Sequence, residues 1–201
     1  DQGDLPVFDT IPRSLSFEAL FAENRYVGLD RIGDADRLTL AATTRLLQNS
    51  GRERAALSLG YLQHLSNPRV QLFGQADIGT GDLIAAEQTV EVSPNIQLRG
   101  WQLWHRDRGE WEEVRASLHL RGSGRRVYNM GFNQRDVLNI KQAELSTYAP
   151  LSEHLAVIGR WHYDLASQRT LEAFVGVECD DCCIKLRLIA RQYLENPSYR
   201  D

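Results

Sequence analysis

The 201-residue chain lacks long apolar runs and blocks of basic residues, and each absence excludes a class of protein. A transmembrane helix needs about 18 consecutive apolar residues, and no stretch approaches that length. A barrel strand needs only about 9–11 residues, so insertion through strands is not excluded. With 23 basic and 27 acidic residues and a net charge of −4, the chain has no basic surface suited to a phosphate backbone. We therefore expect no nucleic acid partner.

Catalytic and metal-binding motifs are also missing. The sequence contains no Gly-x-Ser-x-Gly, no His-Glu-x-x-His and no phosphate-binding loop. Its five histidines are scattered, and its cysteines do not have the spacing of a four-ligand zinc site. We therefore expect no catalytic residues, no cofactor and no metal.

Cysteine is scarce, and the three residues present form one cluster, which we expect to lie in a turn: Cys179, Cys182 and Cys183. Sequential neighbours rarely bond each other, because the ring would strain the peptide between them. Cys182 and Cys183 are therefore expected to bond cysteines outside this chain, or to remain thiols. The chain also begins at Asp1 without an apolar leader, so we expect an excised segment or a processed product.

What the chain does contain is alternation. From residue 37 onward, apolar and polar residues alternate with the period of two that indicates strands. About ten such segments of about ten residues each exceed the ~5–6 residues usual in soluble sheets. We expect an all-β fold, an antiparallel transmembrane β-barrel segment over residues 37–195. Residues 1–36 are expected to form a long ordered loop with one helical turn at 17–21, and 196–201 a link to missing strands.

The connections between these segments favour one orientation. Tight turns are expected near five positions on one side of the sheet, with longer polar links on the other: Ser50, Pro94, Ser123, Pro150 and Asp181. Outer-membrane barrels have short periplasmic turns and longer outer loops. The cysteine cluster is therefore expected to face the periplasm, where disulfides form. Tyr61, Trp104 and Tyr163 fall on the apolar parity near the loop ends, as in an aromatic girdle or as scattered core residues, whereas Trp111 falls on the opposite parity.

The polar parity carries charges of both signs, which we expect to face a barrel lumen: Arg99, Arg115, Arg160, Glu172, Lys185, Arg187 and Arg191. The apolar parity is nearly free of charge, as lipid exposure requires. The same polar residues would also suit the solvated face of a soluble sheet. The basic ones either pair with neighbouring glutamates or meet phosphate groups.

Several stretches together resemble the LptD family, the lipopolysaccharide-assembly barrel proteins of the outer membrane. They follow the family in order along essentially the whole chain: Asp1–Asp9, Asn24–Ala35, Leu38–Leu40, Thr43–Arg45, Val177–Glu178, Cys182–Cys183 and Leu186–Leu188. The adjacent cysteines ahead of a basic strand are the most distinctive of these.

This resemblance implies part of an outer-membrane barrel of about 26 strands. Such a barrel receives lipopolysaccharide from a periplasmic bridge through an N-terminal domain absent here, inserts it into the outer leaflet, and contains an LptE-type lipoprotein plug. It contacts outer-membrane lipid. Cys182 and Cys183 match the family's pair that bonds cysteines near the N-terminus, whereas Cys179 does not belong to that pattern. The resemblance also implies an incomplete sheet with two unpaired edges.

Two alternatives belong to other classes. A self-contained ten-stranded outer-membrane barrel enzyme would need a catalytic cluster at the loop ends, for which His105, Asp107 and His162 are the candidates. Such a barrel requires the first and last strands to pair. A soluble sandwich that binds a partner would be extracted into buffer without detergent.

Overall fold

The computed structural model describes residues 6, 8–28, 30–66, 70, 72, 80–181 and 183–193. The expected link at 196–201 and the predicted disulfide residue Cys182 lie outside these residues. None of the helices formed by the described residues is long and apolar enough to cross a membrane.

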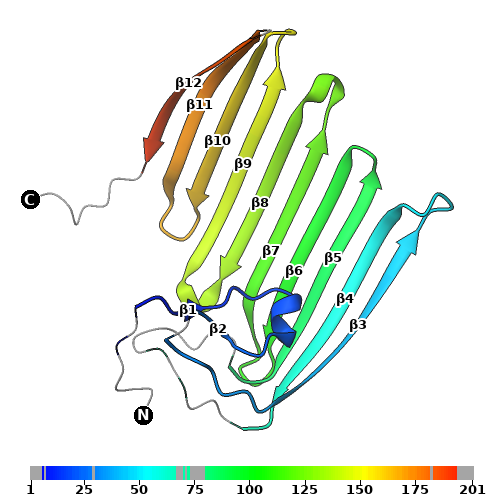
Figure 1. Cartoon of the computed structure of the whole chain (residues 1–201), viewed down its shortest axis with the longest axis vertical. Coiled ribbons are helices and arrows are strands. Elements are labelled where there is room, and N and C mark those ends of the chain that lie inside the picture. The colour runs from blue at the N-terminus through cyan, green and yellow to red at the C-terminus, as the bar shows by residue number, and fades with distance from the viewer. Residues whose placement is uncertain are drawn as a thin grey trace, which may run out of the picture. The chain divides into compact units, whose positions relative to one another are not determined.

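The sheet is a meander of ten antiparallel strands in which each strand is hydrogen-bonded to the next along the chain (Figure 1). Its strands are β3 (Arg37–Leu47), β4 (Glu53–His64), β5 (Leu83–Ser93), β6 (Ile96–His105), β7 (Glu110–Arg121), β8 (Val127–Arg135), β9 (Ile140–Pro150), β10 (Leu155–Asp164), β11 (Arg169–Asp181) and β12 (Ile184–Tyr193). Within the described residues, the edge strands β3 and β12 do not pair with each other. The all-β prediction of about ten antiparallel strands is confirmed, and the sheet is open.

The connections on the two sides of the sheet differ less in length than the sequence predicted. Three links that we expected to be long span only residues 106–109, 136–139 and 165–168. Each link ends in a residue with positive φ, at 66° for Gly109, 52° for Asn139 and 54° for Gln168. A left-handed residue at this position lets a short loop reverse an antiparallel pair, so the strands continue further than their alternation indicated. The difference between the two sides of the sheet therefore rests on the connection 65–82.

The cysteine cluster is also placed differently from the prediction. Cys179 lies inside β11, opposite Leu186 of β12, because the ladder continues as far as the pair Asp181 and Ile184. Only positions 182 and 183 remain between the two strands. The expectation that all three cysteines share a turn was therefore wrong for Cys179.

The chain divides into two compact units. Unit 1 comprises 1–89, 100–114 and 135–138, and unit 2 comprises 90–99, 115–134 and 139–201. Unit 1 contains the hydrophobic core, whose six members are all at most 5% exposed: Leu20, Leu62, Leu83, Ala85, Trp101 and Leu103. Leu15 and Phe17 pack against this core. The N-terminal segment thus covers part of the sheet and creates an interior there.

Leu20 is held at that interior by a helical turn, as predicted. The turn is a 3-10 helix at Glu18–Phe21, labelled η2, and the carbonyl of Leu20 accepts a hydrogen bond from Thr39 Oγ1 of β3 at 3.1 Å. Gly60 of β4 provides the space, because a Cβ there would lie 2.9 Å from Leu20 Cδ1. The absence of a side chain at Gly60 therefore lets the segment approach the sheet closely.

The rest of the segment is more regular than the expected loop. Its two-residue strands β1 (Ile11–Pro12) and β2 (Tyr26–Val27) pair antiparallel. Gly28 follows with φ of 102°, and a Cβ at this position would lie 2.6 Å from the carbonyl oxygen of Asp9. Both its backbone conformation and this close approach require glycine. The chain therefore turns at Gly28, where it lies close to Asp9, next to the pair of strands β1 and β2.

In unit 1, the aromatic pair at the loop end of β6 and β7 differs from the prediction. Trp104 and Trp111 pack edge to face with ring centroids 4.9 Å apart. The alternation of the sequence predicts Trp111 on the opposite parity from Trp104. Glu112 and Glu113 are buried in succession, so the alternation is interrupted between Trp111 and Val114. An irregularity of this kind shifts the facing of every residue before it.

Asp30 holds Phe8 and Asp9 of the N-terminal segment in place, and the strength of this contact depends on pH. Hydrogen bonds from the backbone N–H groups of Asp9 and Phe8, both 2.7 Å from Oδ2, lower the pKa of Asp30 from its usual 3.8. We expect this stabilisation to be present above pH 3.8 and lost as the pH falls through the lowered pKa, because the protonated carboxyl is a weaker acceptor. At neutral pH, Asp30→Asn should speed amide hydrogen exchange at Phe8 and Asp9. The exposed Asp36→Asn is the control, and equal exchange in the two variants would contradict this role.

Candidate functional site: the polar face of the sheet

The strands of unit 2 have an apolar set and a polar set of side chains on opposite parities. On the apolar parity of β11 and β12, Val177 lies opposite Leu188, which is 75% exposed. Exposed apolar residues recur along this parity: Trp161, Val175, Val177, Ile184, Leu186 and Leu188. A continuous exposed apolar surface of this kind marks contact with lipid or with another protein. The charged groups described below lie on the other parity.

Arg160 of β10 joins carboxylates from the two neighbouring strands. Its Nε and Nη2 donate to the carboxylate of Glu144 in β9 at 3.1 and 2.9 Å, and its Nη1 donates to Glu172 in β11 at 3.2 Å. Glu172 also accepts from Nε of Arg191 in β12 at 2.6 Å. Two guanidinium groups therefore alternate with two carboxylates across four strands, and their charges cancel.

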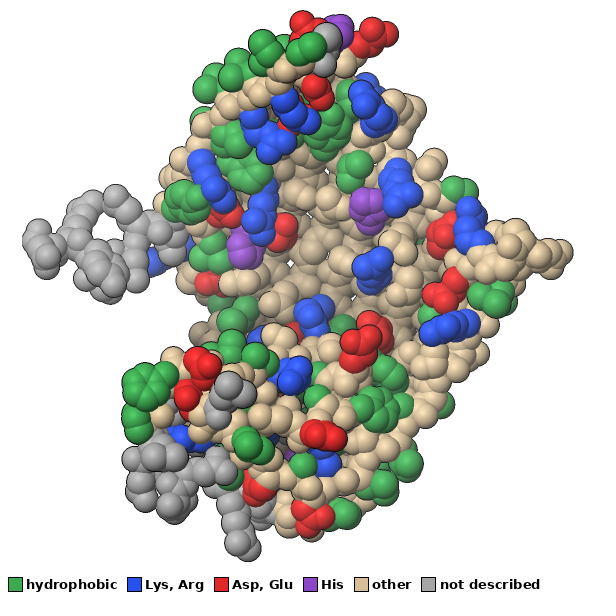
Figure 2. Space-filling model, viewed as in Figure 1, with side chains coloured by type: hydrophobic (Ala, Val, Ile, Leu, Met, Phe, Trp, Pro, Cys, Tyr) green, Lys and Arg blue, Asp and Glu red, His purple; other side chains and the backbone are tan. Residues whose placement is uncertain are grey.

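A second ion-paired group surrounds Glu178 of β11, whose side chain is nearly fully buried. Its carboxylate accepts from Lys185 Nζ at 2.9 Å and from Arg187 Nε at 2.9 Å, both in β12. Lys185 also lies 3.5 Å from Asp180. Figure 2 shows basic and acidic side chains next to each other over β10 to β12. These charged groups satisfy one another and present little net charge.

The structure thus brings together most of the residues that the sequence suggested for a lumen, in these two ion-paired groups: Arg160, Glu172, Lys185, Arg187 and Arg191. The basic residues in these two groups therefore pair with neighbouring glutamates, which is one of the two alternatives that the sequence left open. Arg99 of β6 and Arg115 of β7 are not part of either group.

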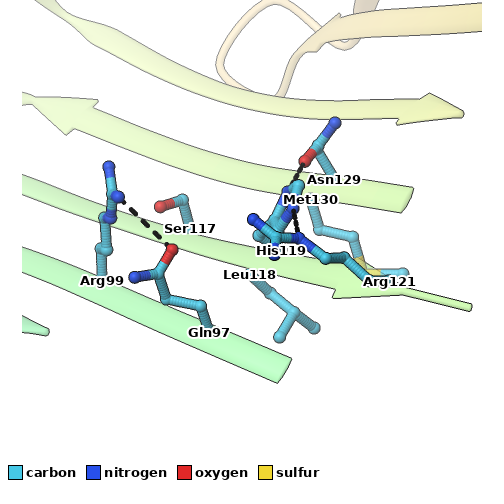
Figure 3. Close-up of a pocket in the computed structure, with 8 residues that line it drawn as sticks. All are labelled: Gln97, Arg99, Ser117, Leu118, His119, Arg121, Asn129 and Met130. Atoms are coloured by element: carbon cyan, nitrogen blue, oxygen red, sulfur yellow. Dashed lines mark hydrogen bonds between the residues drawn. The ribbon is translucent and has the colours of Figure 1, made fainter. Parts of the chain in front are cut away.

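Arg99 instead lines a hollow of about 330 Å³ in unit 2, formed by β6, β7 and β8 (Figure 3). Arg99 and Ser117 lie at one end and His119, Arg121 and Asn129 at the other, all rising from the same face of the sheet. Leu118 points to the opposite face. The described residues that line this hollow, which we call the Arg99 hollow, include two arginines and no carboxylate.

The sequence reasoning missed Glu178, His119, Arg121 and Asn129 as members of these sites. A signal was present for the hollow. On the polar parity, the turn-side ends of β6 and β7 carry Arg99 and Arg121 without an acidic residue between Gln97 and Arg99 or between Ser117 and Arg121. An excess of one charge on neighbouring strands indicates a place where ion pairing is incomplete.

Of the two predicted disulfide residues, the structure describes only Cys183. Cys183 is exposed at the turn between β11 and β12, and the exposed Cys179 forms no disulfide with any described residue. Position 182 lies outside the described residues. The pairing of Cys182 and Cys183 therefore stays a prediction.

The residues suggested for an enzyme have structural partners. His105 is buried, and its Nδ1 accepts from the backbone N–H of Arg108 at 3.2 Å. Asp107 Oδ2 accepts from the backbone N–H of Asp82 at 3.0 Å, and His162 Nε2 lies 3.3 Å from Gln142 Oε1. No group of three or more potential metal ligands occurs among the described residues. The open sheet also lacks the closure that a self-contained barrel enzyme requires.

Comparison with known proteins gives one consistent result. A family model described as "LptD: LPS transport system D" matches residues 1–163. Curated proteins named "LPS-assembly protein LptD" are similar over nearly the whole chain. The one from Nitrosococcus oceani is 36% identical over 198 residues, which cover 98% of this chain and 27% of that protein.

Two further relatives with the same name agree. The protein from Pseudomonas aeruginosa is 33% identical over 234 residues, covering 97% of this chain and 25% of the relative. The protein from Marinobacter nauticus is 31% identical over 204 residues, covering 100% and 26%. The chain thus spans about a quarter of the length of these relatives. The alternative of a self-contained enzyme finds no support among them, and the family match over most of the chain shows that it belongs to the LptD family.

Proposed function

We propose that this chain is part of an outer-membrane translocon that assembles lipopolysaccharide into the outer leaflet. The proposal rests chiefly on membership of the LptD family. It is supported by the antiparallel sheet of long strands, in which one parity is apolar and the other is polar. In this proposal the exposed apolar parity contacts membrane lipid, and the polar parity faces a lumen through which the charged sugars and phosphates pass. The segment performs no covalent chemistry.

The open edges β3 and β12 support a place within a larger barrel. Lone edge strands expose unpaired backbone groups, which a bilayer does not tolerate, so further strands of the full-length protein must pair with them. An LptE-type lipoprotein would fill the lumen, and a periplasmic bridge would deliver lipopolysaccharide through an N-terminal domain. The turn at 182–183 would then face the periplasm, with the connection 65–82 outside.

Depletion of the full-length protein in its own bacterium tests this function. We expect newly made lipopolysaccharide to become inaccessible to reagents that modify only the cell surface, while its chemical structure stays unchanged by mass spectrometry. Expression of the full-length gene from a plasmid is the control and should restore access. Unchanged surface access, or altered lipopolysaccharide chemistry with normal access, would contradict an assembly role.

The cysteines provide a second test, which rests on the family resemblance. In the full-length protein we expect Cys182 and Cys183 to be disulfide-bonded to cysteines outside this chain. The double variant Cys182→Ser, Cys183→Ser should therefore remove the difference in gel mobility between reduced and non-reduced samples. Cys179→Ser, within strand β11, is the matched control and should keep that difference. Ready labelling of both Cys182 and Cys183 by a thiol reagent in the wild-type protein would refute the pairing.

A further inference from the structure

The basic residues on the polar face of unit 2 differ in their partners. In β10 to β12, Arg160, Lys185, Arg187 and Arg191 are ion-paired with Glu144, Glu172 and Glu178. In contrast, Arg99 and Arg121 line a hollow that has no carboxylate among its described lining residues. We propose that the Arg99 hollow binds a phosphoryl group, which supplies the negative charge that the described lining residues lack.

Arg121 is held in a defined orientation by a chain of hydrogen bonds that contains no carboxylate. Asn129 Nδ2 donates to Ser146 Oγ at 3.1 Å, which leaves Asn129 Oδ1 as the acceptor for His119 Nδ1. His119 therefore carries its proton on Nδ1, and its Nε2 accepts from Arg121 Nε at 3.2 Å. Figure 3 shows this succession of Asn129, His119 and Arg121 along one wall of the hollow.

This arrangement uses only one of the donor groups of Arg121. Its Nη1 and Nη2 form no hydrogen bond with the part of the chain that the structure describes. Two parallel N–H groups in a plane match the spacing of two oxygens of a phosphate. His119 contacts the guanidinium through a ring nitrogen and adds no negative charge, whereas a carboxylate at the same place would pair with the guanidinium itself.

Arg99 provides a second cation at the other end of the hollow. Its Nη2 donates to Gln97 Oε1 at 3.3 Å, and no other contact to the described residues holds its guanidinium. Ser117 adds a hydroxyl donor on the same face (Figure 3). The hollow thus presents two positive charges with an uncharged hydroxyl donor between them. This arrangement suits a doubly charged phosphate monoester better than it suits a ligand with a single carboxylate. The volume of about 330 Å³ lies at the lower end of the roughly 300–1,000 Å³ of ligand pockets.

The source of the phosphoryl group follows from the proposed function, and this part of the inference rests on it. A phosphorylated glycolipid crossing the polar face would bring its phosphates past this hollow. Free inorganic phosphate has the same chemistry. Binding of the two is therefore measured separately, and the inorganic arm reports on the hollow even if the transport function is wrong.

The experiment uses the full-length protein purified in a non-phosphorylated, uncharged detergent at low salt. Inorganic phosphate binding is measured by calorimetry, and binding of lipopolysaccharide is compared with that of the same lipopolysaccharide after chemical removal of its phosphates. We expect wild type to bind inorganic phosphate and to prefer the phosphorylated glycolipid. Arg99→Gln with Arg121→Gln should weaken both at least about tenfold, as for loss of charge-assisted hydrogen bonds.

Two matched variants separate this site from general charge effects. Arg45→Gln removes one exposed arginine that is already paired with Glu53 at 3.5 Å, and binding should stay within about twofold of wild type. Arg99→Lys with Arg121→Lys keeps the charges but loses the paired donors, so binding should fall between wild type and the Gln variant. Equal phosphate binding by wild type and the folded Gln variant would overturn the proposal, as would an equal loss in Arg45→Gln. Phosphate binding that depends on both arginines, without glycolipid preference, would support the site and count against the transport function.

Discussion

A lysine at Ala42 is expected to destabilise the full-length protein by about 2–4 kcal/mol, as a basic residue does near the bilayer midplane of a barrel. Ala42 is exposed, lies at the middle of β3 and faces the same side as the exposed Leu40 and Leu46. It lies opposite Leu59 of β4. The charge would therefore sit among apolar side chains on the side proposed to contact lipid.

The adjacent Thr43 provides the control for Ala42. Thr43 is also small and exposed, but it belongs to the polar parity, and its Oγ1 lies 2.8 Å from Ser58 Oγ. Thr43→Lys should cost less than about 1 kcal/mol, the range of a lost neutral hydrogen bond. Urea titration of the protein refolded into phosphatidylcholine vesicles measures both free energies of unfolding. Equal costs at the two positions would contradict a lipid-facing apolar parity.

Truncation of Leu103 is expected to lower the free energy of unfolding by about 2–5 kcal/mol. Leu103 of β6 is fully buried and packs in the same cluster as Leu20, Leu62 and Leu83. Leu103→Ala removes apolar contacts and leaves a cavity, because the sheet backbone and the docked N-terminal segment limit collapse. The loss should also loosen the 3-10 turn that carries Leu20, seen as faster amide exchange in residues 18–21.

Leu98 is the matched comparison for Leu103. Leu98 lies in the same strand but is 42% exposed on the apolar parity, so solvent or lipid can fill the space left by truncation. Leu98→Ala should cost about 1 kcal/mol and leave exchange at 18–21 unchanged. If Leu98→Ala and Leu103→Ala had the same effect on unfolding and exchange, the N-terminal segment would not form a core with the sheet.

The elements that the sequence predicted well are those whose cause is local. Period-two alternation places polar and apolar residues on opposite faces of any strand, so the expectation of about ten strands over residues 37–195 agrees with the ten strands between Arg37 and Tyr193. The lengths of the links were predicted less accurately, because loop-side residues such as Glu110 and Arg169 belong to the strands through a turn geometry that alternation does not encode. Trp111 shows the same limit, since one interruption at Glu112 and Glu113 reverses its facing.

The candidate site was likewise predictable only in part. The polar parity of Arg99, Arg160 and Arg187 follows from their positions in the sequence, because side-chain direction in a strand depends only on parity. Their partners do not, because cross-strand contact depends on register. A shift of the β11–β12 register by two residues would keep every side chain on its face and yet separate Arg187 from Glu178.

The sequence by itself determined the class of this protein. Its alternation specified long antiparallel strands, its charge-poor parity specified an apolar face, and its ordered stretches, including the adjacent cysteines, specified the LptD family. Only the tertiary structure decided which cations are neutralised and which are available. Glu178 and Arg187 are nine residues apart along the chain, and Glu144 and Arg160 sixteen, so strand pairing had to bring them together. The same pairing brought Arg99 and Arg121 to one hollow, which has no carboxylate among its described lining residues.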